Sequence, residues 1–220
     1  MQKVDIANSR VGFHWNQFMR NRVIIPRLRK ELQNHDFTII CNNCTGGIIS
    51  HDLGCEFKSP TVNLFFYGDH FFSFCENFDY YIRLPLVECT NPIHKPDLDY
   101  PVCNLGDLEI HFMHYKTFNE AKAMWERRAN RINRKNIFIM WTFFDKTDEG
   151  LLARFELLPF ENKVAFTERY FSQYASAFCI DGYTEGLGVI TRFSGLSGHR
   201  IVDQFDYVSW LNNGSRSTDS

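Results

Sequence analysis

The stretch from Asn42 to Asn63 holds the side chains best suited to chemistry. Its first loop, Asn42-Asn-Cys-Thr-Gly-Gly47, places Cys44 where a predicted strand gives way to a predicted helix. The free N–H groups and dipole of a helix start favour an anion such as phosphate, and they would lower the pKa of the thiol. Gly46 and Gly47 would let the backbone approach a ligand closely. Cys44 is therefore a candidate nucleophile or a neighbour of a bound anion, with a tight structural turn as the other interpretation.

A nucleophilic thiol needs a base nearby. His51 follows Cys44 by seven residues, which on a helix is about 10.5 Å along the axis and too far for a direct hydrogen bond. The base would then come from a distant histidine, and the sequence does not choose among His111, His114 and His199. Asp145 follows the most apolar predicted strand, where it could act as a base or cap the next helix. The candidate catalytic residues are Cys44, Asp52, Asp145, His111 and His199.

Neutral hydrogen-bonding groups follow in Ser59-Pro-Thr-Val-Asn63. Pro60 holds Ser59 extended, and Thr61 and Asn63 then point to the same side of a strand. With aromatic residues directly after them, these groups suit a sugar, although the aromatics could equally be core and the polar pair a loop cap. The candidate substrate-binding residues are Asn42, Asn43, Gly46, Gly47, Ser59, Thr61 and Asn63.

The chain has seven cysteines, and Cys41 and Cys44 have C-x-x-C spacing. A zinc site would need a second ligand pair, and only His111-x-x-His114 comes near that form. We therefore expect no metal site and no cofactor, and a thiol oxidoreductase is the weakest of the functional alternatives. An odd cysteine count without an apolar leader indicates a reducing compartment, so we expect a cytoplasmic protein.

Strand-like and helix-like segments alternate along the chain. Predicted strands cover 37–41, 108–113, 137–144, 163–167 and 175–180, and predicted helices cover 16–35, 45–54, 69–83, 118–132, 148–157 and 206–211. Residues 85–101 and 182–200 are expected to be loops. This order predicts an α/β fold with a mostly parallel sheet flanked by helices on both faces, in a Rossmann-like three-layer architecture. We expect one domain over 1–211, a disordered polar tail over 212–220, and ligands beyond the carboxyl ends of the strands.

Charge and hydropathy exclude some classes of function. The net charge of −2 gives no reason to expect a nucleic-acid partner. Residues 137–144 form the longest apolar stretch, far below the roughly 20 residues that span a bilayer. Residues 1–35 and 122–135 each carry a net charge of +5 and could touch anionic lipid headgroups or a lipid-linked glycan, or simply be solvated helix faces.

The motifs also resemble a known family. Asn42-Asn-Cys-Thr-Gly-Gly47, His51-Asp-Leu-Gly54 and Phe57-Lys-Ser-Pro-Thr-Val-Asn63 are similar to the motif string of bacterial exopolysaccharide (capsular polysaccharide) biosynthesis proteins, which are built on a domain of unknown function. Thr45 stands where that family has an aromatic residue and His51 where it more often has Arg, which argues against a role for these two side chains. The resemblance covers residues 16–212. It implies an α/β fold and a place in capsule assembly, but it implies no reaction and no catalytic residues.

We therefore expect an enzyme of exopolysaccharide biosynthesis, namely a transferase that acts on a nucleotide-sugar, a lipid-linked sugar or a glycan. Cys44 would attack the donor or line a phosphate loop, and the neutral groups would orient the acceptor. The alternative is a non-catalytic glycan-binding accessory protein of the assembly machinery. In that case Cys44→Ser would leave function intact.

Overall fold

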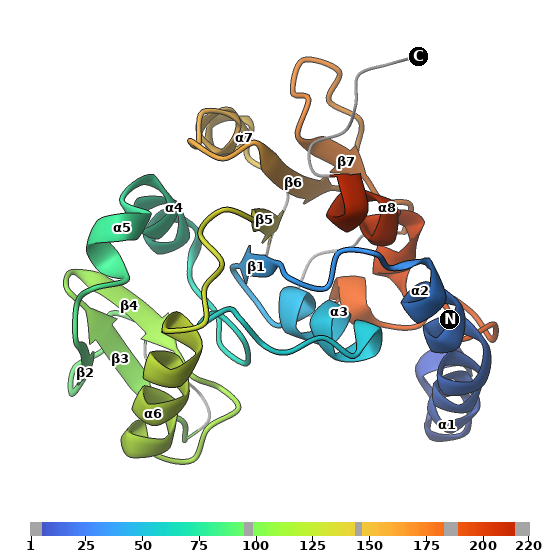
Figure 1. Ribbon diagram of the computed structural model, residues 1–220, viewed down its shortest axis with the longest axis horizontal. Helices are drawn as coiled ribbons and strands as arrows, with labels where there is room; N and C mark the ends of the chain where they lie inside the picture. The colour runs from blue at the N-terminus through green and yellow to red at the C-terminus, as the bar shows by residue number, and fades with distance from the viewer. Residues whose placement is uncertain (1–5, 95–98, 144–146, 183–188, 214–220) are drawn as a thin grey trace, which may run out of the picture.

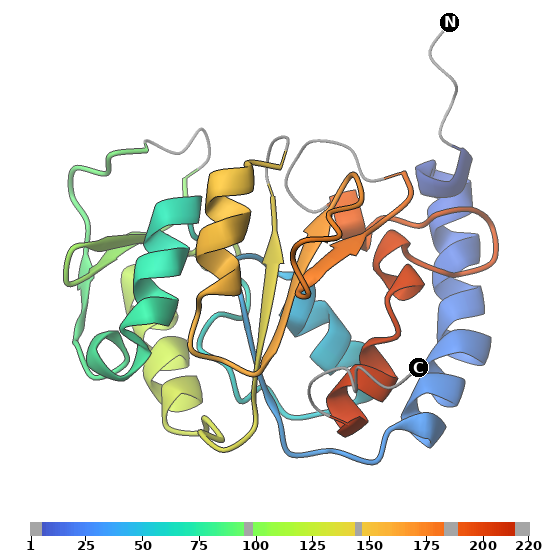
Figure 2. The same ribbon diagram turned by 90° about the horizontal axis from the view of Figure 1, so that it is seen from above.

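The computed structural model describes residues 6–94, 99–143, 147–182 and 189–213 (Figures 1 and 2). A parallel sheet contains β1 (Thr38–Cys41), β5 (Ile137–Thr142), β6 (Asn162–Thr167) and β7 (Ala177–Cys179), in that spatial order. An antiparallel sheet contains β2 (Leu86–Glu88), β3 (Val102–Leu105) and β4 (Leu108–His111). The α/β class is confirmed, but the antiparallel sheet was not expected. It begins with β2, inside the segment 85–101 that we expected to be a loop.

The helices follow the sequence pattern with shifted ends. They are η1 (Ile6–Asn8), α1 (Arg10–Met19), the π-helical turn η2 (Arg20–Ile24), α2 (Ile25–Glu31), α3 (Thr45–Leu53), α4 (Gly68–Glu76), α5 (Phe78–Tyr81), α6 (Phe118–Ala129), α7 (Glu149–Glu156), η3 (Val189–Thr191), η4 (Ile201–Gln204) and α8 (Tyr207–Asn213). Helix α1 starts earlier than expected because the Ser9 side chain caps it by accepting from the N–H of Gly12. Helix α8 extends two residues past 211. In the described ranges, no helix has the length and apolar character needed to cross a bilayer.

The parallel sheet has apolar residues on both of its faces. Along β5, Ile139 and Trp141 join one buried cluster, while Phe138 and Met140 join another. The first cluster includes side chains of α4, α6, α7 and the antiparallel sheet, and the second includes side chains of α3 and α8. This explains the continuous apolar run of β5, since a strand buried on both faces needs no alternation. Figure 1 shows the antiparallel sheet on the α4 and α6 side of the molecule, away from α8.

Gly46 and Gly47 let α3 pack tightly against its neighbours. A Cβ at Gly46 would lie 2.7 Å from Cγ2 of Ile39, and a Cβ at Gly47 would lie 3.0 Å from Cγ1 of Val62. The close approach predicted for a ligand is therefore made instead to side chains of the protein itself. This packing fixes the height of α3 above β1.

We predict that Gly46→Ala destabilises the fold. Overpacking a dense core costs about 1–3 kcal/mol, which is partly offset by roughly 0.5–1 kcal/mol from replacing a helical glycine. The measurement is the free energy of unfolding in urea. Gly195→Ala is the matched control, because a Cβ there meets nothing within 4 Å. A Gly46→Ala protein as stable as Gly195→Ala would contradict the packing role.

Candidate functional site

The two asparagines after β1 are occupied by the protein itself. Asn42 Nδ2 donates to the carbonyl of Thr142 at 2.8 Å, and Asn42 Oδ1 accepts from the N–H of Thr142 at 3.0 Å. Asn43 Oδ1 accepts from the N–H of Thr45 at 3.0 Å, and its amide also bonds to the hydroxyl of Thr142. Both side chains are buried. The amides thus close the carboxyl ends of β1 and β5 and cap α3, and they are not directed toward a substrate.

Ser59 and Thr61 also stabilise the end of the parallel sheet through hydrogen bonds. Thr61 Oγ1 accepts from the N–H of Cys41 at 3.0 Å, and the hydroxyls of Ser59 and Thr61 lie 2.9 Å apart. Asn63 differs, because it is half-buried and its φ of 66° is in the left-handed region. Its side chain makes no hydrogen bond with the described residues, so it alone of the predicted neutral side chains keeps its amide for a ligand.

Cys44 lies where it was expected, at the start of α3, but its chemistry differs. The side chain is half-buried, with Sγ 4.0 Å from the carbonyl oxygen of Leu64. Burial raises the pKa of Cys44 to about 11, and the neighbouring Cys41 acts in the same direction. Desolvation therefore outweighs the helix-start field, and the expected lowering of the pKa is wrong. A thiol in this state is a poor nucleophile near neutral pH.

Asp52 belongs to a buried charge cluster around Arg20. The guanidinium lies with Nε 2.7 Å from Asp52 and Nη1 2.6 Å from Asp203, and it is 1% exposed. Burial opposes the charge of Arg20, but the hydrogen bond and charges of its carboxylate partners outweigh burial and raise its pKa. His199 Nδ1 lies 3.5 Å from Asp203 at the exposed edge of this cluster. No hydrogen bond or ion pair among the described residues links the cluster to Cys44 or His111, so Asp52 is the counter-ion of a buried arginine.

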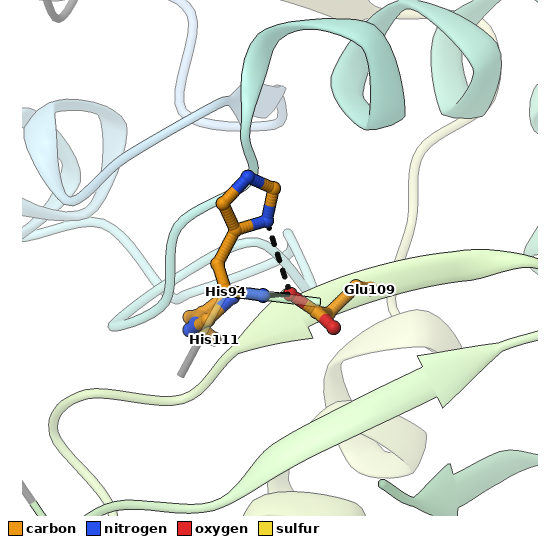
Figure 3. Close-up of side chains that lie close together, drawn as sticks. All are labelled: His94, Glu109 and His111. Atoms are coloured by element: carbon orange, nitrogen blue, oxygen red, sulfur yellow. Dashed lines mark hydrogen bonds and ion pairs between the residues drawn. The ribbon is translucent and has the colours of Figure 1, made fainter. Parts of the chain in front are cut away.

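His111 is part of a second, denser cluster. On β4, Glu109 and His111 lie on the same side, and His111 Nε2 is 2.9 Å from Glu109 Oε1. His94 Nδ1 approaches the same oxygen at 3.4 Å, as Figure 3 shows. Glu109 Oε2 accepts from the N–H of Ile93 at 2.6 Å, and His111 Nδ1 lies 3.3 Å from the hydroxyl of Tyr100. Two imidazoles thus share one carboxylate in what we name the β4 cluster: His94, Glu109 and His111.

The β4 cluster is buried at its base and open on one side. The side chains of His111 and Glu109 are 1% and 3% exposed, whereas that of His94 is 43% exposed. Aromatic rings hold the imidazoles, since Phe65 stacks on His111 at 4.6 Å and Tyr67 on His94 at 3.8 Å. Burial acts to raise the pKa of Glu109, but hydrogen bonds from His111 and two backbone N–H groups outweigh it, so this pKa is lowered. Burial lowers the pKa of His111, which favours a neutral imidazole.

Of the predicted catalytic residues, only His111 lies in this cluster. Asp145 falls outside the described residues. Glu109 could have been found from the sequence, because it lies two residues before His111 in an otherwise apolar predicted strand and two such residues share one face. His94 gave no usable signal, since it lies in a long proline-containing segment and reaches the cluster only through tertiary folding.

Two hollows lie away from the β4 cluster. A cavity of about 210 Å³ lies beside His199 and Asp203, below the roughly 300 Å³ of small-molecule pockets. A larger hollow of about 570 Å³ is lined by Glu76, Asp79 and Arg134. Its acids are already paired, Asp79 with Arg134 and Glu76 with Arg154. Neither hollow brings together unpaired acid and base groups.

We predict that Cys44 is unreactive in the native protein. With a pKa of about 11, roughly one thiol in a thousand is ionised at pH 8. Alkylation by iodoacetamide, read by peptide mass spectrometry between pH 7 and 10, should rise with pH and remain slow below pH 9. The urea-unfolded chain is the control, in which Cys44 should react at the rate of an ordinary thiol. Fast native labelling at pH 7 would restore the thiolate hypothesis.

We also predict that Arg20→Met strongly destabilises the fold. Removing one partner of a buried ion pair leaves uncompensated charge, at a cost of about 3–5 kcal/mol. The measurement is again urea unfolding. Arg27→Met is the control and should change stability little, because the ion pair of Arg27 with Glu31 is exposed. Equal losses in the two variants would show that Asp52 is not held as a structural counter-ion.

Comparison with known proteins identifies the family of this chain. Residues 15–212 match the family model of a domain of unknown function, DUF1919. The chain is also 41% identical over 196 residues to an uncharacterized protein of Haemophilus influenzae, across 88% of this chain and 93% of that protein. The family match spans both sheets and most of α8. The chain therefore belongs to the DUF1919 family.

Proposed function

We propose that this protein is a cytoplasmic enzyme of bacterial exopolysaccharide biosynthesis, a transferase that activates a hydroxyl of a sugar or lipid-linked glycan at the β4 cluster. The observation that carries the proposal is the buried carboxylate of Glu109 held between two imidazoles, one of them half-exposed. The half-exposed imidazole of His94 can accept a proton from a substrate hydroxyl, and the ionised carboxylate of Glu109 stabilises the imidazolium that forms. The assignment to exopolysaccharide biosynthesis rests on the motif resemblance. We also propose that the fold has a Rossmann-like three-layer architecture.

The surroundings of the β4 cluster suit a sugar. Phe65 and Tyr67 stack on its imidazoles and follow Asn63 along the chain, so an amide and aromatic rings lie on one short segment. The open side at His94 is where an acceptor hydroxyl would meet the cluster. Cys44 has no part in this mechanism, because burial raises its pKa.

Membrane contact stays part of the proposal, since a lipid-linked substrate would be met at a bilayer surface. Along the exposed side of α1, Val11, Trp15 and Phe18 are 81%, 50% and 53% exposed. Arg10 and Arg22 flank them. Exposed aromatic and basic residues on one helix are typical of interfacial contact. Arg20 of the same basic stretch is buried and takes no part.

We predict that Glu109→Gln abolishes polymer formation in a bacterial strain in which the variant replaces the native protein. Loss of a positioned acid–base group costs about 10²–10⁴-fold in rate. The measurement is surface polysaccharide per cell at equal protein level. The matched control is Glu56→Gln, an exposed glutamate paired with Arg131, and Cys44→Ser should also be normal.

The non-catalytic alternative predicts a different outcome. If Glu109→Gln and His94→Ala make normal polymer while Asn63→Gly lowers glycan binding, the chain is an accessory binding protein. Asn63→Gly removes the amide and keeps the left-handed backbone, so lost binding would not reflect strain. Normal polymer in Glu109→Gln would overturn the enzymatic proposal.

A further inference from the structure

We propose that His94, Glu109 and His111 bind a divalent transition-metal cation, with Zn²⁺ the ion their chemistry favours. This inference deepens the proposed function and rests on it for the role of the metal, but the binding itself can be tested separately. One ligand atom from each residue lies within 4.8 Å of the other two. Two histidines and a glutamate form a ligand set that holds zinc in hydrolytic enzymes.

The distances fit a shared cation. Ligands about 2.1 Å from a tetrahedral zinc lie roughly 3.4 Å from one another. His94 Nδ1 lies 3.4 Å and His111 Nε2 2.9 Å from Glu109 Oε1. A cation between these atoms therefore requires only small movements of the carboxylate. His94 and His111 come from separate segments, and the charged Glu109 supplies an anionic ligand.

The groups behind the ligands are those that a metal site uses. A ligating imidazole donates its other N–H to an oxygen, which fixes its tautomer. With His111 Nε2 on the metal, its proton sits on Nδ1 and donates to the Tyr100 hydroxyl, 3.3 Å away. The Ile93 N–H holds Glu109 Oε2 at 2.6 Å. The stacked rings of Phe65 and Tyr67 limit rotation of both imidazoles.

The open side gives the cation a function. With three protein ligands, zinc keeps a fourth position for water or substrate, and the exposed face of His94 places that position toward solvent. A hydroxyl bound there loses its proton more readily because the cation stabilises the alkoxide. With the cation bound, the three side chains act as ligands rather than as bases, and the proton leaves to solvent water at the open side. The sugar hydroxyl of the proposed reaction would occupy this position. Imidazole ligands favour Zn²⁺ over Mg²⁺, which prefers an all-oxygen shell.

The test is a metal titration of the full chain. After removal of metals with EDTA, ZnCl₂ is added in competition with a chromophoric chelator, and MgCl₂ is titrated separately. We expect one Zn²⁺ per chain and no Mg²⁺ binding. His94→Ala and Glu109→Gln should each weaken zinc binding by more than about 10-fold, since even loss of an outer-shell partner costs 10–100-fold. Circular dichroism confirms that the variants fold, and the exposed His94 makes the first substitution mild.

Two controls locate the ion. His114→Ala removes an exposed histidine three residues from His111, and Cys44→Ser removes the C-x-x-C pair as a ligand set. Both should bind zinc like the unmodified chain. Bound Co²⁺ should absorb in the visible without the near-ultraviolet band of a cobalt–thiolate bond. No stoichiometric zinc binding, or loss of binding in Cys44→Ser but not in His94→Ala, would overturn the proposal.

Failure of the metal site and failure of the proposed function give different results. Zinc binding at the β4 cluster together with normal polymer in Glu109→Gln would support the metal site and remove the transferase. Loss of polymer in Glu109→Gln without zinc binding to the unmodified chain would overturn the metal site and leave a metal-free acid–base site.

Discussion

The two-residue bridge between Phe65 and His111 joins the halves of this molecule. Phe65 donates to the carbonyl of His111 at 2.9 Å and accepts from its N–H at 3.0 Å, so the chain leaving the parallel sheet pairs with the last residue of β4. The next residue, Phe66, donates to the carbonyl of Asn42 at 2.9 Å. The β4 cluster is thereby fixed relative to the carboxyl end of β1. Among the described residues, this bridge is the backbone pairing that links β4 to the segment leading to Asn42.

Polar side chains in and around the loop after β1 stabilise the backbone near the Phe65–His111 bridge. Asn42 continues the hydrogen-bond pattern between β1 and β5 beyond the last strand residue, and Thr61 satisfies the N–H of Cys41. Buried amides and hydroxyls that find every partner rigidify a structure, whereas one unmet partner costs about 1–3 kcal/mol. The most distinctive motif of the sequence is therefore a joint between elements. Its side chains serve the structure, and the reactive site that we propose lies at the β4 cluster.

The sequence predicted the elements better than the site. The apolar run of 137–144 and the spacing of apolar residues over 118–132 are local signals, and they predicted a strand and a helix close to those observed. The antiparallel sheet was missed because β2 has only three residues in a segment with several prolines. A three-residue strand carries almost no periodicity of its own, and its pairing with β3 is a tertiary property.

Burial determines the chemical state of the candidate residues that the sequence indicated. Cys44, Asp52 and Asn42 had suitable residue types and positions, but desolvation and buried partners determine what such groups do. The spacing of residues along the sequence shows neither the desolvation nor the buried partners. His94 and Glu109 meet because the segment around His94 folds back on β4, a contact between residues 15 apart that no local pattern encodes. Only the pair Glu109 and His111 was accessible from the sequence, through its period of two.

Anomalous X-ray diffraction at the zinc edge, from crystals of the full chain grown with Zn²⁺, most directly tests where the chemistry of this protein lies. We expect one strong peak per chain, bounded by His94 Nδ1, the carboxylate of Glu109 and His111 Nε2. A peak between Cys41 and Cys44 would return the chemistry to the loop after β1. No peak within bonding distance of the three ligand atoms would contradict the β4 cluster as a metal site.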